Sequence, residues 1–160
     1  MIPLKDEEPT RINVRWTRLR RYDDVIDGCA DDARANLYFI ARRFGSADPK
    51  IIYIGKTRQL VSTRLGQPDH KDRYRRWKKA YPRQTLLVAH GIISMPDGNL
   101  TQKRIDVAER LLTYSTSLDH TENRTNIYSH RINEPYLITS SGSRLSLPKT
   151  IRLGVVISNN

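Results

Sequence analysis

The stretch from Asn36 to Thr57, NLYFIARRFGSADPKIIYIGKT, decides the fold that the sequence predicts. It contains two apolar runs rich in β-forming residues, Leu37 to Ala41 and Ile51 to Ile54. Residues typical of a turn separate the two runs: Gly45, Ser46, Asp48 and Pro49. We therefore expect a β-hairpin whose loop is longer than two residues.

The residues before the hairpin predict a short strand and a brief helix. Apolar and polar residues alternate from Ile12 to Trp16, which is the period of a half-buried strand. The helix is indicated by apolar residues at helical spacing: Tyr22, Val25, Ile26 and Cys29.

The residues after the hairpin predict further helices and one more buried strand. Leu60, Val61 and Leu65 form a helical stripe that ends near Gly66. The apolar run TLLVAHGII at 85–93 predicts a buried strand, and residues 101–116 predict a helix. The apolar stripe of that helix consists of Ile105, Ala108 and Leu112, and Glu109 borders it.

The C-terminal tail predicts additional β-structure. Two apolar segments, Tyr136 to Thr139 and Leu145 to Leu147, flank Ser141-Gly142 and suggest a second hairpin, and Ile151 to Ile157 suggests one more strand. A chain of 160 residues is most simply one domain, 1–160. We expect its core at about 36–126, with an N-terminal arm at 1–30 and a C-terminal β appendage at 130–160.

The formal net charge of +11 favours a polyanionic partner, with nucleic acid ahead of an anionic membrane surface. No apolar run approaches the roughly 20 residues that a spanning helix needs. The N-terminus lacks the layout of a secretory signal, and Cys29 is the only cysteine. These features suit a reducing cytoplasm. The sequence shows neither a Cys/His zinc pattern nor a Gly-rich phosphate loop.

The basic stretch from Lys71 to Arg83, KDRYRRWKKAYPR, has two interpretations. Its aromatic residues recur at helical spacing: Tyr74, Trp77 and Tyr81. In the first interpretation these aromatics form a core stripe of a helix, and the charges lie on its solvated face. In the second, the charges contact phosphates. The candidate nucleic-acid-binding residues are Arg73, Arg75, Arg76, Lys78 and Lys79.

The hairpin and the residues that follow it resemble the GIY-YIG nuclease family. The second motif of that family stands here as Tyr53-Ile54-Gly55, and the first, Asn36-Leu37-Tyr38, keeps the tyrosine and loses the glycine. The order of tyrosine, YIG, arginine, glutamate and asparagine extends to Asn126. The resemblance implies an α/β (α+β) fold with a small, mainly antiparallel sheet flanked by helices. It also implies a divalent-metal-dependent endonuclease that hydrolyses phosphodiester bonds. Double-stranded DNA is the first candidate substrate, and RNA is the alternative.

The resemblance assigns roles to four side chains around one Mg²⁺ or Mn²⁺ ion. Glu109 would be the metal ligand, and Arg64 would brace the scissile phosphate with its planar fork. Tyr38 would be the general base for water, and Tyr53 would support it from the paired strand. A phenol is a weak base at neutral pH, so we expect Lys56, Arg64 and the metal to lower its pKa.

Two further positions follow from the family pattern. Asn123 fits the asparagine that closes the site, and Asn126 is the second choice. Many members have a histidine one helical turn after the arginine, where this chain has Pro68. His70 substitutes for it only if the chain bends back, and a lone histidine beside a basic run is more often exposed.

Each site residue also has an ordinary structural explanation. Arg64 would then pair with a carboxylate inside the fold, and Glu109 would form a surface salt bridge with Arg110 or Lys103. The tyrosines would be plain strand aromatics. Correspondingly, the chain could be a non-catalytic nucleic-acid-binding protein on the same scaffold, or a structural protein bound to ribosomal RNA. A duplex-cutting enzyme with one site per chain would be expected to form a homodimer.

Overall fold

The computed structural model describes residues 8–28, 35–116, 135–152 and 155–157. Eight strands and four helices are found in these residues. Their order is β1 (Thr10–Trp16), β2 (Arg20–Arg21), α1 (Tyr22–Ile26), β3 (Leu37–Phe44), β4 (Lys50–Lys56), α2 (Val61–Leu65), α3 (Pro68–Ala80), β5 (Gln84–Ser94), α4 (Gln102–Ser115), β6 (Tyr136–Gly142), β7 (Thr150–Arg152) and β8 (Val155–Ile157).

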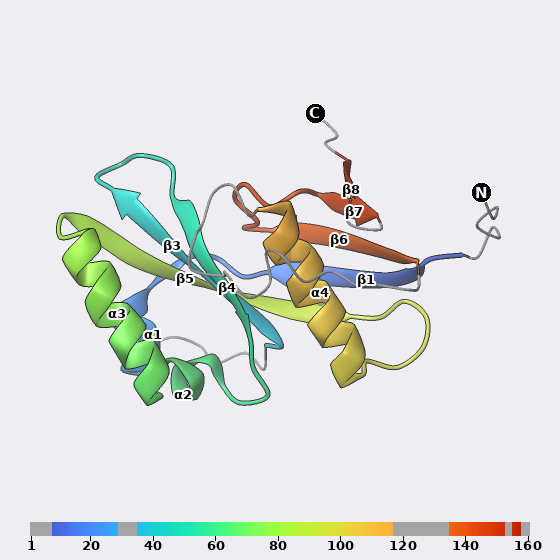
Figure 1. The fold of residues 1–160 in the computed structure, drawn as a ribbon, viewed down its shortest axis with the longest axis horizontal. Coiled ribbons are helices and arrows are strands. Elements are labelled where there is room, and N and C mark those ends of the chain that lie inside the picture. Colours follow the sequence, from blue (N-terminus) through green and yellow to red (C-terminus); the bar gives the residue numbers. More distant parts are fainter. Residues whose placement is uncertain (1–7, 29–34, 117–134, 153–154, 158–160) are drawn as a thin grey trace.

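The strands form one mixed sheet in the order β4-β3-β5-β1-β6-β7-β8 (Figure 1). The short strand β2 pairs with β5 in addition. Every pair is antiparallel except β1 with β6. The structure therefore confirms the α+β class and the mainly antiparallel sheet. No helix in the described part of the chain is long and apolar enough to cross a membrane.

The predicted central hairpin is formed by β3 and β4. Tyr38 on β3 pairs with Gly55 on β4, and Ile40 pairs with Tyr53. The register shifts after Ile40, so Ile52 is an extra residue in the edge strand β4. Beyond this bulge, Tyr53 and Gly55 lie on the same face of β4 because side chains alternate along a strand. Both tyrosines of the two motifs consequently belong to the same buried cluster.

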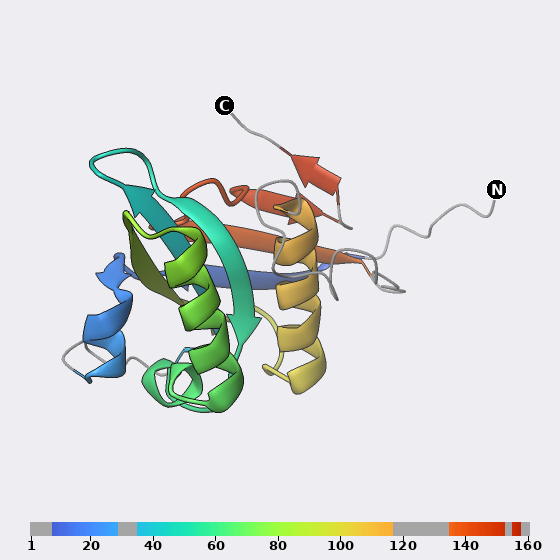
Figure 2. The ribbon, with the colours of Figure 1, turned by 60° about the vertical axis from the view of Figure 1, so that its left-hand side comes forward.

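The two faces of the sheet carry separate apolar cores. Leu37 and Phe39 of β3 pack with the apolar face of α4 in one core. Tyr38 and Ile40, which alternate with them, pack with residues of α1, α2 and α3 in the other. Figure 2 shows β4, the edge strand, running between α3 and α4. The end of β4 therefore brings residues from both helical layers together.

Two parts of the sheet differ from the arrangement that the sequence suggested. The strand predicted near Ile12 is β1, and it lies between β5 and β6. Thr10–Trp16 is thus a central strand of the sheet and not part of an arm beside it.

The tail also joins the sheet, because β6 pairs in parallel with β1 along its whole length. The partner of β6 in its hairpin is Thr150–Arg152, so the expectation that Leu145 to Leu147 forms this strand is wrong. Those residues lie in a turn, where Leu145 has a φ of 51°. A left-handed residue does not continue a strand, and this is the physical reason for the difference.

Candidate functional site

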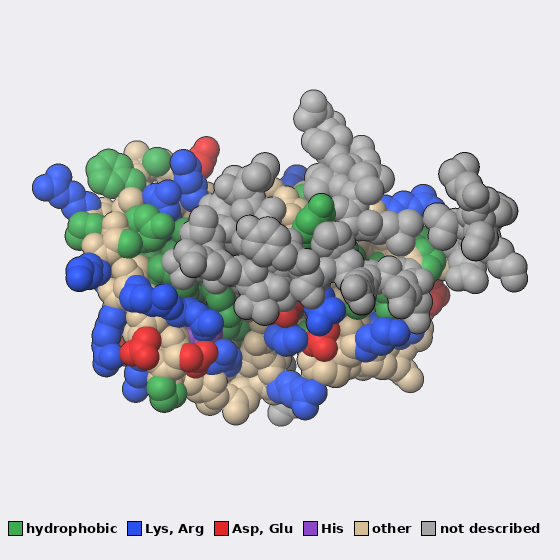
Figure 3. Space-filling view, in the orientation of Figure 1, with side chains coloured by type: hydrophobic (Ala, Val, Ile, Leu, Met, Phe, Trp, Pro, Cys, Tyr) green, Lys and Arg blue, Asp and Glu red, His purple; other side chains and the backbone are tan. Residues whose placement is uncertain are grey.

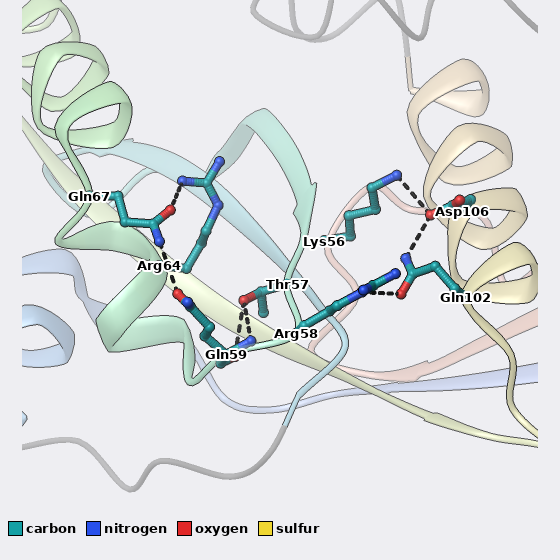
Figure 4. A pocket seen from close by; sticks show the side chains of 8 residues that line it. All are labelled: Lys56, Thr57, Arg58, Gln59, Arg64, Gln67, Gln102 and Asp106. Carbon is teal, nitrogen blue, oxygen red and sulfur yellow. Dashed lines mark hydrogen bonds and ion pairs between the residues drawn. The ribbon is translucent and has the colours of Figure 1, made fainter.

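A cavity of about 500 Å³ lies at the end of β4, between α2 and α4 (Figure 4). Three of its lining side chains are cationic and one is a carboxylate. The lining residues are Lys56, Thr57, Arg58, Gln59, Arg64, Gln67, Gln102 and Asp106. We call the side that carries Arg64 and Gln67 the α2 wall and the side that carries Lys56 and Asp106 the α4 wall. The excess of positive charge suits an anionic ligand.

The α2 wall is organised around Arg64. Its guanidinium donates two parallel hydrogen bonds to Asp69, from Nη1 to Oδ1 and from Nη2 to Oδ2, both 2.9 Å long. Nη1 also donates to Gln67 Oε1 at 2.6 Å, and Gln67 Nε2 donates to Gln59 Oε1 at 2.9 Å. The hydrogen bond from Arg64 holds the pKa of Asp69 far below its usual range. Arg64 therefore has a carboxylate partner, but the Asp69 side chain is 47 % exposed and does not lie inside the fold, where the structural interpretation of the sequence placed it.

The α4 wall is organised around Lys56. Its Nζ lies 2.7 Å from Asp106 Oδ1 and 3.4 Å from Glu109 Oε2. Burial raises the pKa of Glu109, and Lys56 offsets this only in part. For Lys56, burial lowers the pKa, but the hydrogen bond to Asp106 and the charge of Glu109 outweigh it and raise the pKa overall. Glu109 thus pairs with Lys56, the charge of Arg110 adds a smaller effect, and the carboxylate is buried rather than on the surface.

Tyr38 and His70 form a hydrogen-bonded pair behind the α2 wall. The Tyr38 hydroxyl lies 2.6 Å from His70 Nε2, and both residues are fully buried. The expectation that His70 is exposed is therefore wrong. It failed because α3 begins at Pro68, which places His70 in the first turn, facing the sheet. No partner for His70 Nδ1 is found within the described residues.

The pKa of Tyr38 is raised, not lowered. Desolvation is the largest cause, the Tyr53 phenol adds to it, and Arg64 opposes it without prevailing. Lys56, which was expected to lower the pKa of Tyr38, forms its ion pairs with Asp106 and Glu109 instead. Burial and the charges of Arg64 and Arg73 lower the pKa of His70 to about 4. At neutral pH the pair is therefore an un-ionised phenol hydrogen-bonded to a neutral imidazole.

The Tyr53 ring packs beside this pair. Its ring centroid is 6.1 Å from that of Tyr38 and 5.5 Å from that of His70, and the Arg73 guanidinium lies 4.9 Å above it. Burial raises the pKa of Tyr53, Arg73 lowers it, and the charge of Glu109 raises it further. This electrostatic coupling links the tyrosines on the α3 side of β4 to the acid of the α4 wall.

The buried His70 makes the stability of the protein depend on pH. Its folded pKa of about 4 lies below the ordinary value of 6.5, so the unfolded chain binds the additional proton between these values. Stability supplied by this residue is present above pH 6.5 and is lost as the pH falls towards 4. We expect the free energy of unfolding to fall by about 2 kcal/mol more in the wild type than in His70→Gln between pH 7.5 and pH 5. Urea unfolding of both proteins at both pH values measures this difference, and equal losses would contradict it.

The basic side chains of α3 divide into two groups. Arg73 contacts Asp69 and the Tyr53 ring, Arg75 pairs with Asp72, and Lys78 lies over the Tyr74 ring. Arg76 and Lys79 are exposed. Lys and Arg side chains cover α3 at the left of Figure 3. Of the aromatic residues in this stretch, Trp77 is fully buried, and Tyr74 and Tyr81 pack against the same core. The core-stripe interpretation of the aromatics is therefore correct, and the solvated charges remain available to a polyanion.

Three charged residues of the site were not found from the sequence. Asp69 comes directly after the proline that begins α3, and an acid in a first helical turn is a common stabilising feature. Asp106 lies one turn before Glu109, and Arg58 follows the YIG strand and donates to Gln102 Oε1 at 2.7 Å. The spacing of Asp106 and Glu109 was the one available signal, because residues three apart share a helix face. Asn123 and Asn126 lie outside the described residues.

No protein-family model, no curated protein and no solved structure matches the chain. The described residues contain no group of three or more His, Cys, Asp or Glu side chains placed to hold a metal ion. The site thus consists of a tyrosine-histidine pair, a second tyrosine, an arginine held by an aspartate, and a lysine between two acids.

Proposed function

We propose that this chain is a divalent-metal-dependent endonuclease that hydrolyses phosphodiester bonds of nucleic acid, with double-stranded DNA as the first candidate substrate. The observation that supports this most is the cavity at the end of β4, which Lys56, Arg58 and Arg64 line with positive charge and beside which Lys56 contacts Glu109. In Figure 4, Arg64 lies on one side of it, and Lys56 and Arg58 point towards α4 on the other. The order of the site residues along the chain, which resembles that of GIY-YIG nucleases, also supports the proposal.

The residues of the α4 wall fit a hard divalent cation. Glu109 and Asp106 offer carboxylate oxygens one helical turn apart, and Mg²⁺ is commonly held by one or two carboxylates together with waters and substrate phosphates. Lys56 already contacts both carboxylates, so this wall attracts positive charge. Glu109 would hold the ion, with Asp106 as the second candidate. When bound, Mg²⁺ or Mn²⁺ supplies Lewis-acid stabilisation of phosphoryl oxygens and a water of lowered pKa.

The protein's own groups have separate tasks in this proposal. Arg64 and Lys56 stabilise the negative charge that gathers on the phosphoryl oxygens, which is the largest contribution in phosphoryl transfer. Tyr53 and the Tyr38–His70 pair pack behind the α2 wall and keep it rigid beside the scissile phosphate. Because burial raises the pKa of Tyr38, its phenol does not act as a base in the state described here. The exposed Arg76 and Lys79 contact phosphates away from the cleavage point.

A non-catalytic nucleic-acid-binding protein is the second candidate. Two observations favour it: Glu109 is ion-paired with Lys56, and Tyr38 is fully buried with a raised pKa. Such a protein would use the cavity and α3 to hold phosphates without hydrolysing them. Its binding would weaken steeply with salt, and it would show no turnover.

Incubation of the purified protein with supercoiled plasmid separates the two candidates. For the nuclease we expect nicked or linear products with Mg²⁺ or Mn²⁺ and none when EDTA is present. End mapping shows whether hydrolysis leaves defined phosphate and hydroxyl termini. Intact plasmid with both metals, together with salt-sensitive retention of the plasmid in a gel, would favour the binding protein instead.

A further inference from the structure

The contacts of Arg64 leave one edge of its guanidinium open. An arginine has five N–H donors in a rigid plane. Both Nη1 donors are engaged, one by Asp69 and one by Gln67, and one Nη2 donor is engaged by Asp69. Within the described residues no partner is found for Nε or for the second Nη2 hydrogen. These two donors lie on the same edge of the plane and point in parallel.

The open edge borders the cavity. Arg64 lines that space, and Figure 4 shows its guanidinium between Gln67 on one side and the gap that faces Lys56 on the other. Two parallel N–H donors match two oxygens of a phosphate or phosphodiester. The Arg64 side chain is 23 % exposed, so a ligand in the cavity can reach it.

The orientation of this edge depends on Asp69. Arg64 lies on α2 and Asp69 in the first turn of α3, so the bidentate pair joins two helices. The two parallel hydrogen bonds to Asp69 fix the rotation of the guanidinium plane. The single hydrogen bond to Gln67 holds only Nη1 and would leave the plane free to turn about it. Arg73 Nη1 also donates to Asp69 Oδ2, at 3.0 Å, and this contact holds the carboxylate in place.

We propose that Asp69 is a positioning residue that turns the Nε/Nη2 edge of Arg64 towards the scissile phosphodiester. The proposal rests on the proposed nuclease function for its kinetic consequence, but the orientation of Arg64 is a property of the protein alone. Asp69 is a carboxylate near the phosphate site, so its negative charge opposes substrate binding. Removing it therefore affects turnover and affinity differently.

The kinetic test uses Asp69→Asn, with Asp72→Asn as the matched control. Asp72 lies on the same helix, carries the same charge and pairs with Arg75 on the exposed surface. For Asp69→Asn we expect kcat to fall at least about tenfold, while the Kd for duplex DNA in EDTA stays within about threefold of the wild type or tightens. Asp69→Glu, which keeps a carboxylate, should recover part of kcat. Asp72→Asn should leave kcat unchanged, and any tightening of its Kd measures the effect of removing one negative charge from α3.

A second measurement decides the orientation without cleavage. The Nε–H resonance of Arg64 is assigned in ¹H–¹⁵N spectra by its loss in Arg64→Lys. In the wild type we expect a separate, sharp Arg64 signal that shifts on addition of dimethyl phosphate. In Asp69→Asn the signal should move to the position of freely rotating arginines and respond less. If the wild type does not cleave plasmid but gives these spectra, the proposed function fails and the positioning by Asp69 stands.

Three results would overturn the proposal. An unchanged kcat in Asp69→Asn would show that Asp69 does not position Arg64, and a raised kcat would show that Asp69 keeps Arg64 away from the phosphate. An unchanged Arg64 signal in that variant would show that Gln67 is sufficient. Equal losses of kcat and DNA affinity with a lowered Tm would show that Asp69 has a structural role only.

Discussion

Replacement of Glu109 by glutamine is expected to slow plasmid nicking by at least about a thousandfold, or about 4 kcal/mol of transition-state stabilisation. Glutamine keeps the shape of the side chain and removes the negative charge that would hold the metal ion. Burial raises the pKa of Glu109, so the folded protein carries this charge at a cost. The variant should consequently fold as stably as the wild type, and Lys56 keeps its 2.7 Å contact with Asp106.

Binding measurements make this prediction specific for catalysis. Glutamine removes a negative charge beside the phosphate-binding cations, so the affinity for duplex DNA in EDTA should be unchanged or higher. Asp72→Asn, on the outer face of α3, removes a charge far from the α4 wall and should nick plasmid at the wild-type rate. Nicking by purified Glu109→Gln at more than about a tenth of the wild-type rate would remove Glu109 from the proposed site.

The parts of the fold that were predicted correctly depend on local patterns. The hairpin of β3 and β4, the strand β5 and the helix α4 were placed within a few residues of their observed bounds. Apolar periodicity and turn residues decide such elements within a short window. The position of β1 between β5 and β6 does not follow from any such window. It depends on long-range backbone pairing, of β1 with β5 on one edge and with β6 on the other. The pairing of β6 with Thr150–Arg152 depends on a turn that contains a left-handed leucine.

The same division applies to the candidate site. Arg64, Glu109 and the two tyrosines were selected because their order resembles that of a known family, and the structure brings them to the end of β4 and the faces beside it. Their partners were not predictable in this way. Asp69 holds Arg64 because only Gly66 and Gln67 separate the end of α2 from the first turn of α3, and His70 is buried because Pro68 begins that helix. The raised pKa of Tyr38 follows from complete burial, which outweighs the nearby Arg64 and which no sequence pattern reports.

Substitution of Gly55 by alanine is expected to destabilise the protein and to displace both tyrosines. Gly55 pairs directly with Tyr38 across the hairpin, and the Tyr38 ring lies over it. A Cβ at this position would be 2.5 Å from Tyr38 Cζ and Oη and 2.8 Å from Tyr53 Cε1. Neither ring can withdraw easily, because Tyr38 is fully buried and its hydroxyl is bonded to His70. We expect a loss of about 2–4 kcal/mol in the free energy of unfolding, from overpacking and from the broken hydrogen bond.

Gly66→Ala is the matched control for this substitution. Its Cβ would meet only the Ser62 and Thr63 carbonyl oxygens at 3.5 Å, an ordinary contact, so the change should stay within about 0.5 kcal/mol. Urea unfolding measures both variants. The cost of Gly55→Ala should shrink when it is measured in a Tyr38→Leu background, because the nearest clashing atoms are then absent. An equal cost in both backgrounds would mean that Gly55 is required for the strand and not for the tyrosine. The close approach of the Tyr38 ring would then not be the reason why a glycine stands at position 55.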